Sequence, residues 1–141
     1  MLPEQQGRYE LTDYAIQDKV RVEVYWRDDR AGYGPAASIY AYDQEILRLD
    51  CFGEDNGTKG TGHCHINLRQ TKARQWQYRP GSVRDHIEQA MHDLQENLNY
   101  CLQTNTDEKI QQTIIHSETL KPITQQVEEK MLGFMSQLNM D

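Results

Sequence analysis

The feature that most constrains the fold is a change in the spacing of apolar residues at Pro80-Gly81-Ser82. Before this point apolar and polar residues alternate, as in Val20-Arg21-Val22-Glu23-Val24-Tyr25-Trp26, which is the pattern of a half-buried β-strand. After it, from Val83 to Cys101, apolar residues recur every three or four positions, which is the spacing of an amphipathic helix. The change predicts a sheet followed by a helix that covers its apolar face.

The alternating segments predict four or five strands joined by short connections, and therefore an antiparallel meander. We expect these strands at about 20–26, 37–42 and 46–52, in the histidine segment 63–68, and, as a fifth, at 75–79. The polar residues 1–18 predict at most a short strand at 8–11. Gly, Pro and Asp residues predict a loop at 28–35 and a tight turn at 43–45.

Helical signals dominate the rest of the chain. Ser82 is a good N-cap, with Asp85 in the first turn, so a helix of about 82–102 is predicted. A short helix at 107–118 and a second amphipathic helix at about 122–139, with Pro122 in its first turn, follow. The second helix is expected either to pack on the domain or to bind a partner.

These elements predict an α+β fold. An antiparallel four- to five-stranded sheet packs on one long amphipathic helix, with an additional C-terminal helix. We divide the chain into an α+β core domain at 1–103 and a helical C-terminal extension at 104–141.

Composition narrows the possible functions. The net charge of −7 opposes non-specific attachment to nucleic acid, which favours a basic surface. The sequence has no apolar run near the roughly 18–20 residues of a membrane span, and no basic start followed by an apolar stretch. We therefore expect a cytoplasmic protein away from membranes. Three cysteines without a CxxC motif predict reduced, packed thiols.

The segment Gly60-Thr61-Gly62-His63-Cys64-His65 carries the densest chemistry. In a strand, His63 and His65 point to the same side, and pairing with the strand 46–52 sets Arg48 and Asp50 beside them. A carboxylate orients an imidazole, and an arginine holds a phosphate. Such a set can cleave an RNA phosphodiester through the 2′-hydroxyl without a metal or any other cofactor.

Two other interpretations of the histidines stay open. Polar residues on a solvated sheet face are ordinary, so the pair could be only exposed polar residues. A zinc site is the other possibility, but it needs a third ligand, which Asp50 or Glu54 could supply. His86 and His92 lie six apart on the predicted helix and do not share a face, so we interpret them as surface or boundary residues.

One stretch interleaves basic and aromatic residues. It predicts contacts with single-stranded RNA through phosphate binding and base stacking, and its candidate substrate-binding residues are Arg69, Lys72, Arg74 and Tyr78. The alternative is a β-hairpin with a basic turn and aromatic side chains, including Trp76, that anchor it in the core.

The order of these motifs resembles the TumE-like toxins of bacterial toxin–antitoxin modules. The likeness covers roughly residues 37–100, from the strand Leu47-Arg48-Leu49-Asp50, through a Gly-containing loop and the G-x-G-x-H-x-H-like segment, to Tyr78-Arg79-Pro80-Gly81-Ser82-Val83 and the helix. It implies an endoribonuclease that a co-encoded helix-turn-helix antitoxin neutralises. His63 and His65 would be its first site residues, and Asp50, Glu54 and Asp55 its second. Those toxins are usually shorter, and residues 104–141 match no part of them.

We therefore expect a metal-independent endoribonuclease toxin. His63 and His65 share the acid and base roles, Arg48 contacts the phosphate and Asp50 orients a histidine. The alternative is a catalytically inactive interaction or accessory subunit of a larger prokaryotic complex, which binds an antitoxin or another protein through the C-terminal helix. The sequence does not predict an oligomeric state.

Overall fold

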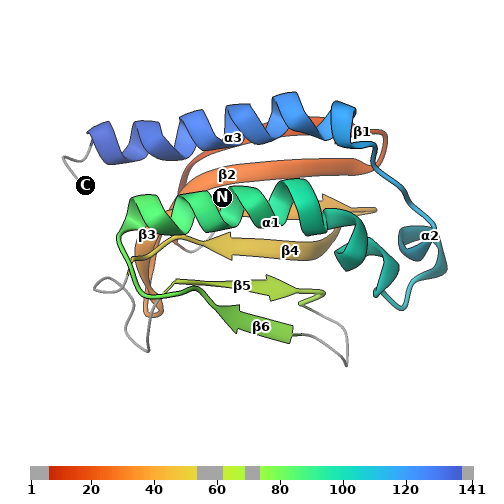
Figure 1. Ribbon diagram of the computed structural model, residues 1–141, viewed down its shortest axis with the longest axis horizontal. Helices are drawn as coiled ribbons and strands as arrows, with labels where there is room; N and C mark the ends of the chain where they lie inside the picture. Colours follow the sequence, from red (N-terminus) through yellow and green to blue (C-terminus); the bar gives the residue numbers. More distant parts are fainter. Residues whose placement is uncertain (1–6, 54–61, 69–73, 138–141) are drawn as a thin grey trace.

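The computed structural model describes residues 7–53, 62–68 and 74–137, and they form an α+β fold. The described strands build one six-stranded antiparallel sheet in the order β1-β2-β3-β4-β5-β6, a simple meander. Figure 1 shows the sheet with α1 and α3 lying side by side on one of its faces. The strands are β1 Arg8–Gln17, β2 Val20–Asp29, β3 Gly32–Ala41, β4 Gln44–Asp50, β5 His63–Ile66 and β6 Arg74–Gln77.

The expectation of four or five strands was too low, because the segment at 8–11 belongs to a ten-residue strand, β1. Its pairing with β2 shifts register between Tyr9 and Thr12 and again between Ala15 and Gln17. Glu10 also has a positive φ of 52°. These bulges interrupt the alternation of side chains, so the sequence shows no clear strand period there.

The predicted loop at 28–35 is instead largely strand. β2 runs to Asp29 and β3 begins at Gly32, with Asp28 paired with Tyr33. A Cβ atom on Gly34 would lie 2.5 Å from the carbonyl oxygen of Cys51, so a glycine is required where the two backbones approach closely. The next turn comprises Tyr42 and Asp43, both with positive φ, one residue earlier than expected.

The two long helices cover the apolar face of the sheet, which we call the helical face. On it, Val22 of β2, Ile39 of β3 and Leu47 of β4 lie opposite one another across the strands. Helix α1, Val83–Gln103, begins with Ser82 as N-cap in a capping box with Asp85, as the sequence predicted. A short helix, α2 Glu108–Gln111, follows it.

Helix α3, Ser117–Gln137, begins earlier than predicted and contains Pro122 in its interior. The Pro122 nitrogen, which lacks a hydrogen, falls early in the helix and the residue is exposed, so only one hydrogen bond near the first turns is lost. Val127, Met131 and Phe134 of α3 are buried in the same hydrophobic cluster as the sheet and α1. The C-terminal helix therefore packs on the domain.

Cys51, Cys64 and Cys101 are free and buried, as expected for packed thiols. Among the helices of the described residues, none combines the length and the apolar character that crossing a membrane needs.

His86 is fully buried, which corrects the interpretation of a surface or boundary residue. Its Nδ1 accepts a hydrogen bond from the Gly53 backbone N–H at 3.1 Å, and its Nε2 lies 2.9 Å from the Arg79 carbonyl oxygen. The ring therefore carries its proton on Nε2. The His86 ring thus connects Gly53, which follows β4, with Arg79, which follows β6. These two strands flank the histidine strand β5 in the sheet.

Replacing His86 with alanine should lower the free energy of unfolding by about 2–4 kcal/mol, because two backbone groups lose their partner in the interior. Urea unfolding monitored by circular dichroism measures this change. His92→Ala is the matched control on the exposed side of α1 and should change the free energy by no more than about 0.5 kcal/mol. Equal effects of the two substitutions would contradict the structural role of His86.

Candidate active site on the open sheet face

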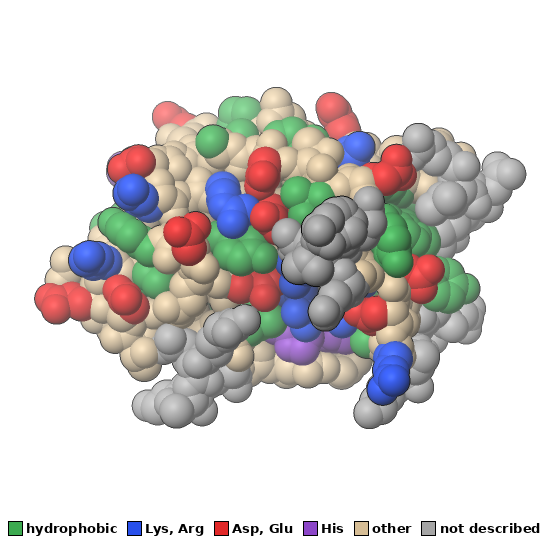
Figure 2. Space-filling model, turned by 180° about the vertical axis from the view of Figure 1, so that it is seen from behind, with side chains coloured by type: hydrophobic (Ala, Val, Ile, Leu, Met, Phe, Trp, Pro, Cys, Tyr) green, Lys and Arg blue, Asp and Glu red, His purple; other side chains and the backbone are tan. Residues whose placement is uncertain are grey.

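Polar side chains from four neighbouring strands meet on the sheet face opposite the helices, which we call the polar face. The register sets Glu23 opposite Ser38, Ser38 opposite Arg48, and Arg48 opposite His65. One pleat further, Asp50 lies opposite His63. Because side chains alternate along each strand, these residues share one face while Leu47, Leu49 and Cys64 contribute to the other. Figure 2, which views the molecule from behind, shows histidine and basic side chains together on this face.

Asp50 is the centre of the site and has no exposed surface. Its Oδ1 lies 2.9 Å from Nη1 of Arg27, and its Oδ2 lies 3.3 Å from both Nε of Arg48 and Nε2 of His63. Burial alone would raise the pKa of Asp50. The hydrogen bond with His63 and the charges of Arg27 and Arg48 outweigh it and hold that pKa well below its usual range. Asp50 is therefore a buried, ionised carboxylate.

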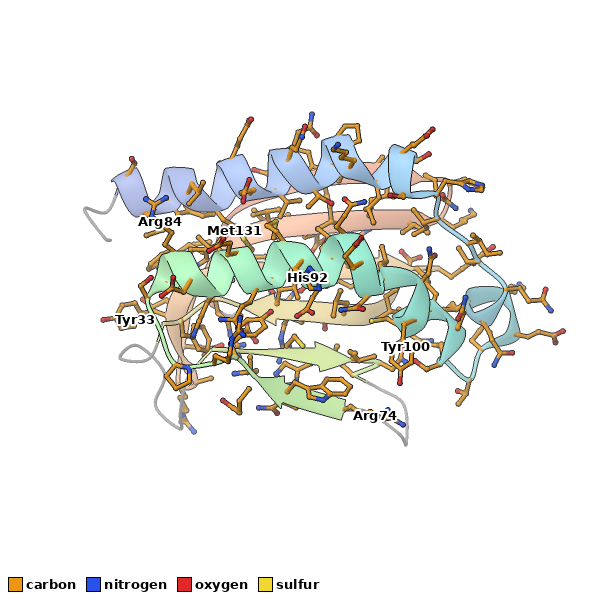
Figure 3. The ribbon with its side chains drawn as sticks, in the orientation of Figure 1. Tyr33, Arg74, Arg84, His92, Tyr100 and Met131 are labelled. Atoms are coloured by element: carbon orange, nitrogen blue, oxygen red, sulfur yellow. The ribbon has the colours of Figure 1, made fainter. Side chains whose placement is uncertain are left out.

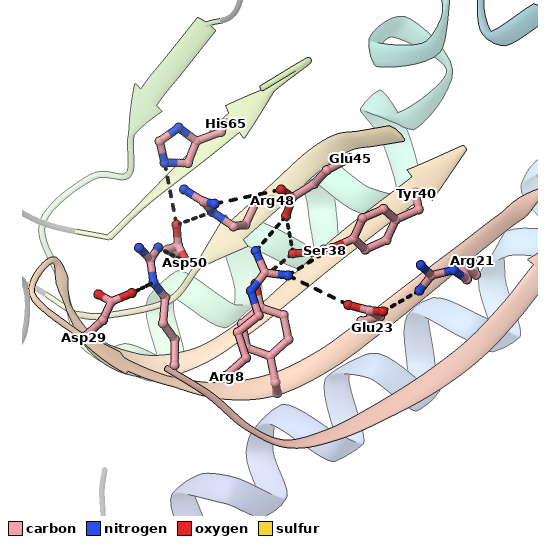
Figure 4. A network of polar contacts seen from close by, with 12 residues as sticks. Arg8, Arg21, Glu23, Asp29, Ser38, Tyr40, Glu45, Arg48, Asp50 and His65 are labelled. Carbon is pink, nitrogen blue, oxygen red and sulfur yellow. Dashed lines mark hydrogen bonds and ion pairs between the residues drawn. The ribbon is translucent and has the colours of Figure 1, made fainter. Parts of the chain in front are cut away.

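The two histidines lie against each other beside Asp50. Their ring centroids are 4.6 Å apart and the ring planes are at 82° to one another. His65 Nε2 is 3.7 Å from Asp50 Oδ2, and Figure 4 shows this contact. Burial and the nearby charge of Arg48 lower the pKa of His65 to about 4. The neutral ring offers a nitrogen lone pair, and a fifth of the side chain is exposed, so solvent and ligands can reach it.

A second set of contacts continues the polar face toward β1 (Figure 4). Arg8 donates from Nη1 to the Tyr40 hydroxyl at 3.0 Å and from Nη2 to Glu45 Oε2 at 3.2 Å. Ser38 donates to the same oxygen of Glu45. Glu23 accepts a hydrogen bond from Arg21. Acidic and basic groups thus neutralise one another across this half of the face.

Sequence reasoning missed Arg27 and Arg8 as members of the site. Arg27 continues the alternation of Arg21, Glu23 and Tyr25, so the signal was present, but the Asp-, Gly- and Pro-rich residues that follow suggested a loop. Arg8 lies in the strand whose bulges conceal its period. Its guanidinium carbon lies 4.7 Å from the centre of the Tyr25 ring.

The structure places the other predicted site residues elsewhere. Arg74, the first residue of β6, is exposed and donates to the hydroxyl of Tyr100 on α1 at 3.1 Å. Figure 3 labels both residues. Tyr78 is buried against His86 of α1, with ring centroids 5.3 Å apart, and so contributes to the core. Arg69, Lys72, Glu54 and Asp55 lie outside the described residues.

The site offers two kinds of chemistry. Neighbouring imidazoles next to a carboxylate and a guanidinium can transfer protons at a phosphate ester. One ligand atom from each of Asp50, His63 and His65 also lies within 4.8 Å of the other two, so the three residues could hold a metal ion. The side chain of Trp76 does not contribute here, because Trp76 pairs with Cys64 and shares the helical face with it.

Comparison with known proteins gives no family assignment: no family model, no curated protein and no solved structure matches this chain. The resemblance to the TumE-like toxins and the site roles it implies therefore stay predictions.

Replacing Asp50 with alanine should lower the free energy of unfolding by about 3–5 kcal/mol, because it removes the buried counter-charge that Arg27, Arg48 and His63 share. Chemical denaturation measures the loss. Asp13→Ala removes a carboxylate that is largely exposed and pairs with Arg21, so this control should cost no more than about 1 kcal/mol. A similarly small loss for Asp50→Ala would show that the buried cluster does not stabilise the sheet.

Proposed function

We propose that the protein is a metal-independent endoribonuclease of the toxin type and that the polar face cleaves RNA. The observation that carries this proposal is the packing of His63 and His65, with ring centroids 4.6 Å apart, beside Arg48 and the buried Asp50. Two proton carriers and a cation at one point are what cleavage through the RNA 2′-hydroxyl requires, and His65 and Arg48 are the partly exposed members that a phosphate can reach.

The proposed reaction is a transesterification. One histidine accepts the proton of the 2′-hydroxyl while the 2′-oxygen attacks the adjacent phosphorus. The bond from phosphorus to the 5′-oxygen breaks, and the other histidine gives that oxygen a proton. The products are a 2′,3′-cyclic phosphate and a 5′-hydroxyl, and no atom changes its oxidation state.

The solvent exposure of Arg48 and Asp50 decides which of them can contact RNA. Arg48 keeps 17% of its side chain exposed and can reach a phosphate oxygen, where its charge would stabilise the developing negative charge. Asp50 has no exposed surface, so it cannot touch RNA and acts as a positioning residue for His63. Arg74 remains a candidate for binding the RNA strand away from the reacting phosphate.

The alternative of an interaction module that uses the C-terminal helix receives no support from the packing. The apolar residues of α3, among them Val127, Met131 and Phe134, are buried against the domain's own sheet and α1, as Figure 3 shows for Met131. Deleting this helix would expose the core, so the deletion would test stability and not partner binding.

The double substitution His63→Ala/His65→Ala should lower the rate of RNA cleavage by at least about 100-fold, because each proton carrier contributes roughly 10²–10⁴-fold. Single-turnover cleavage of a labelled single-stranded RNA in EDTA, with detection of the cyclic phosphate end, measures this. His92→Ala is the matched histidine control and should cleave normally. Unchanged cleavage by a folded double variant would refute the proposal.

The toxin part of the proposal predicts that induced expression of the intact chain arrests growth and that the double variant, at equal soluble level, does not. Growth curves together with measured protein levels check this. If both proteins arrest growth, the toxicity does not depend on His63 and His65.

Arg48→Ala should lower the single-turnover rate constant by about 10²–10³-fold, as loss of a donor to a developing charge does. Arg74→Ala should leave the rate constant at saturating RNA unchanged and act, if at all, on RNA binding, because Arg74 pairs with Ile66 on the helical face and contacts Tyr100 of α1. The concentration dependence of cleavage distinguishes the two effects. A normal rate constant for Arg48→Ala would exclude a phosphate role for Arg48.

A further inference from the structure

The polar face brings together donor atoms in an arrangement that fits one metal ion. His63 Nε2 lies 3.3 Å and His65 Nε2 lies 3.7 Å from the same carboxylate oxygen, Oδ2 of Asp50. Ligand atoms at about 2.0–2.2 Å from a tetrahedral Zn²⁺ are separated from one another by roughly 3.3–3.6 Å. The two distances to Asp50 match this geometry closely, and all three donor atoms lie within 4.8 Å of one another, so rotation of the imidazoles would bring the third pair into range.

We propose that Asp50, His63 and His65 form a Zn²⁺ site and that the bound ion switches off the acid–base pair. The inhibition by zinc rests on the proposed nuclease function, whereas the binding of zinc does not. The ion would bind Nε2 of each imidazole and leave the hydrogen of each ring on Nδ1, so neither ring could accept a proton from RNA. Zinc would therefore be an inhibitor of the site and not a cofactor.

The chemistry of the donor set favours zinc over magnesium or calcium. Two imidazole nitrogens and one carboxylate oxygen suit Zn²⁺, whereas the two hard cations favour sites made of oxygen ligands. Three protein ligands leave a fourth position for water. A fifth of the His65 side chain is exposed, so its imidazole is the ligand that an ion from solvent would meet first.

The surrounding charges would tune this site. Arg27 contacts the other carboxylate oxygen, Oδ1, at 2.9 Å, so it can stay in place and orient Asp50 while Oδ2 binds the ion. Arg48 contacts Oδ2 through Nε at 3.3 Å and would have to give up that contact. Glu45, 4.0 Å from Nη1 of Arg48, offers the displaced guanidinium another partner. Arg48 is thus a competitor of the metal for the same oxygen.

The test is a titration of the purified full chain with Zn²⁺ in competition with a chromophoric chelator, supported by the absorption spectrum of bound Co²⁺. The intact chain should bind one ion tightly. His65→Ala should weaken binding by more than about 100-fold, because it removes a ligand atom, whereas loss of a residue that only supports a ligand costs roughly 10- to 100-fold. His92→Ala should not weaken it. Arg48→Ala should bind zinc about tenfold more tightly, because it removes a competing positive charge.

The outcomes separate the two proposals. No zinc binding, or binding that His65→Ala leaves unchanged, would overturn the metal site whether or not RNA is cleaved. Zinc binding together with cleavage that persists at one equivalent of Zn²⁺ would overturn the switch. Inhibition at one equivalent, reversed by EDTA and accompanied by tighter zinc binding in Arg48→Ala, would support both halves. If no RNA cleavage is detected, the titration still decides the metal site.

Discussion

The polar face is organised around one buried charge, the carboxylate of Asp50. An ionised group without exposed surface is costly unless opposite charges and hydrogen bonds compensate it, and here Arg27, Arg48 and His63 provide that compensation from three different strands. The carboxylate therefore fixes the relative positions of β2, β4 and β5 on the side that the described helices do not cover. The same contacts orient the imidazole of His63, so the stability of the sheet and the geometry of the site depend on one residue.

The sheet can keep one face polar because the helices supply the core on the other side. Helices α1 and α3 both pack on the helical face, where the apolar residues of the strands gather into one cluster. The polar face can then be built from charged and titratable side chains that neutralise one another. His86 of α1 stabilises this part of the sheet, because its ring hydrogen-bonds to Gly53 after β4 and to Arg79 after β6. In this way a buried histidine connects the chain that follows β4 with the chain that follows β6, the two strands that pair with β5.

The sequence predicted the structure correctly where the local spacing of apolar residues agrees with the tertiary packing. Strict alternation placed Arg48, Asp50, His63 and His65 on one face, and the Ser82–Asp85 capping box marked the start of α1. Prediction failed where local rules are broken. The bulges of β1 concealed Arg8, glycines in the β2–β3 hairpin concealed the membership of Arg27, and Pro122 lies inside α3 although it resembled a start signal. The burial of His86 follows from loops distant in sequence, which no local pattern contains.

The proposed function must be reconciled with the acidic character of the chain. With a net charge of −7 the whole molecule repels a polyanion, so attraction must come from a local arrangement. On the polar face most guanidiniums are already paired with carboxylates, and Arg48 shares Asp50 with Arg27 and both histidines. A phosphate could therefore recruit Arg48 only by drawing it partly away from Asp50, whereas a metal ion would displace it from the same oxygen. Anion and cation would bind to opposite partners of a single ion pair, which makes Arg48 the residue on which the balance between the two ligands depends.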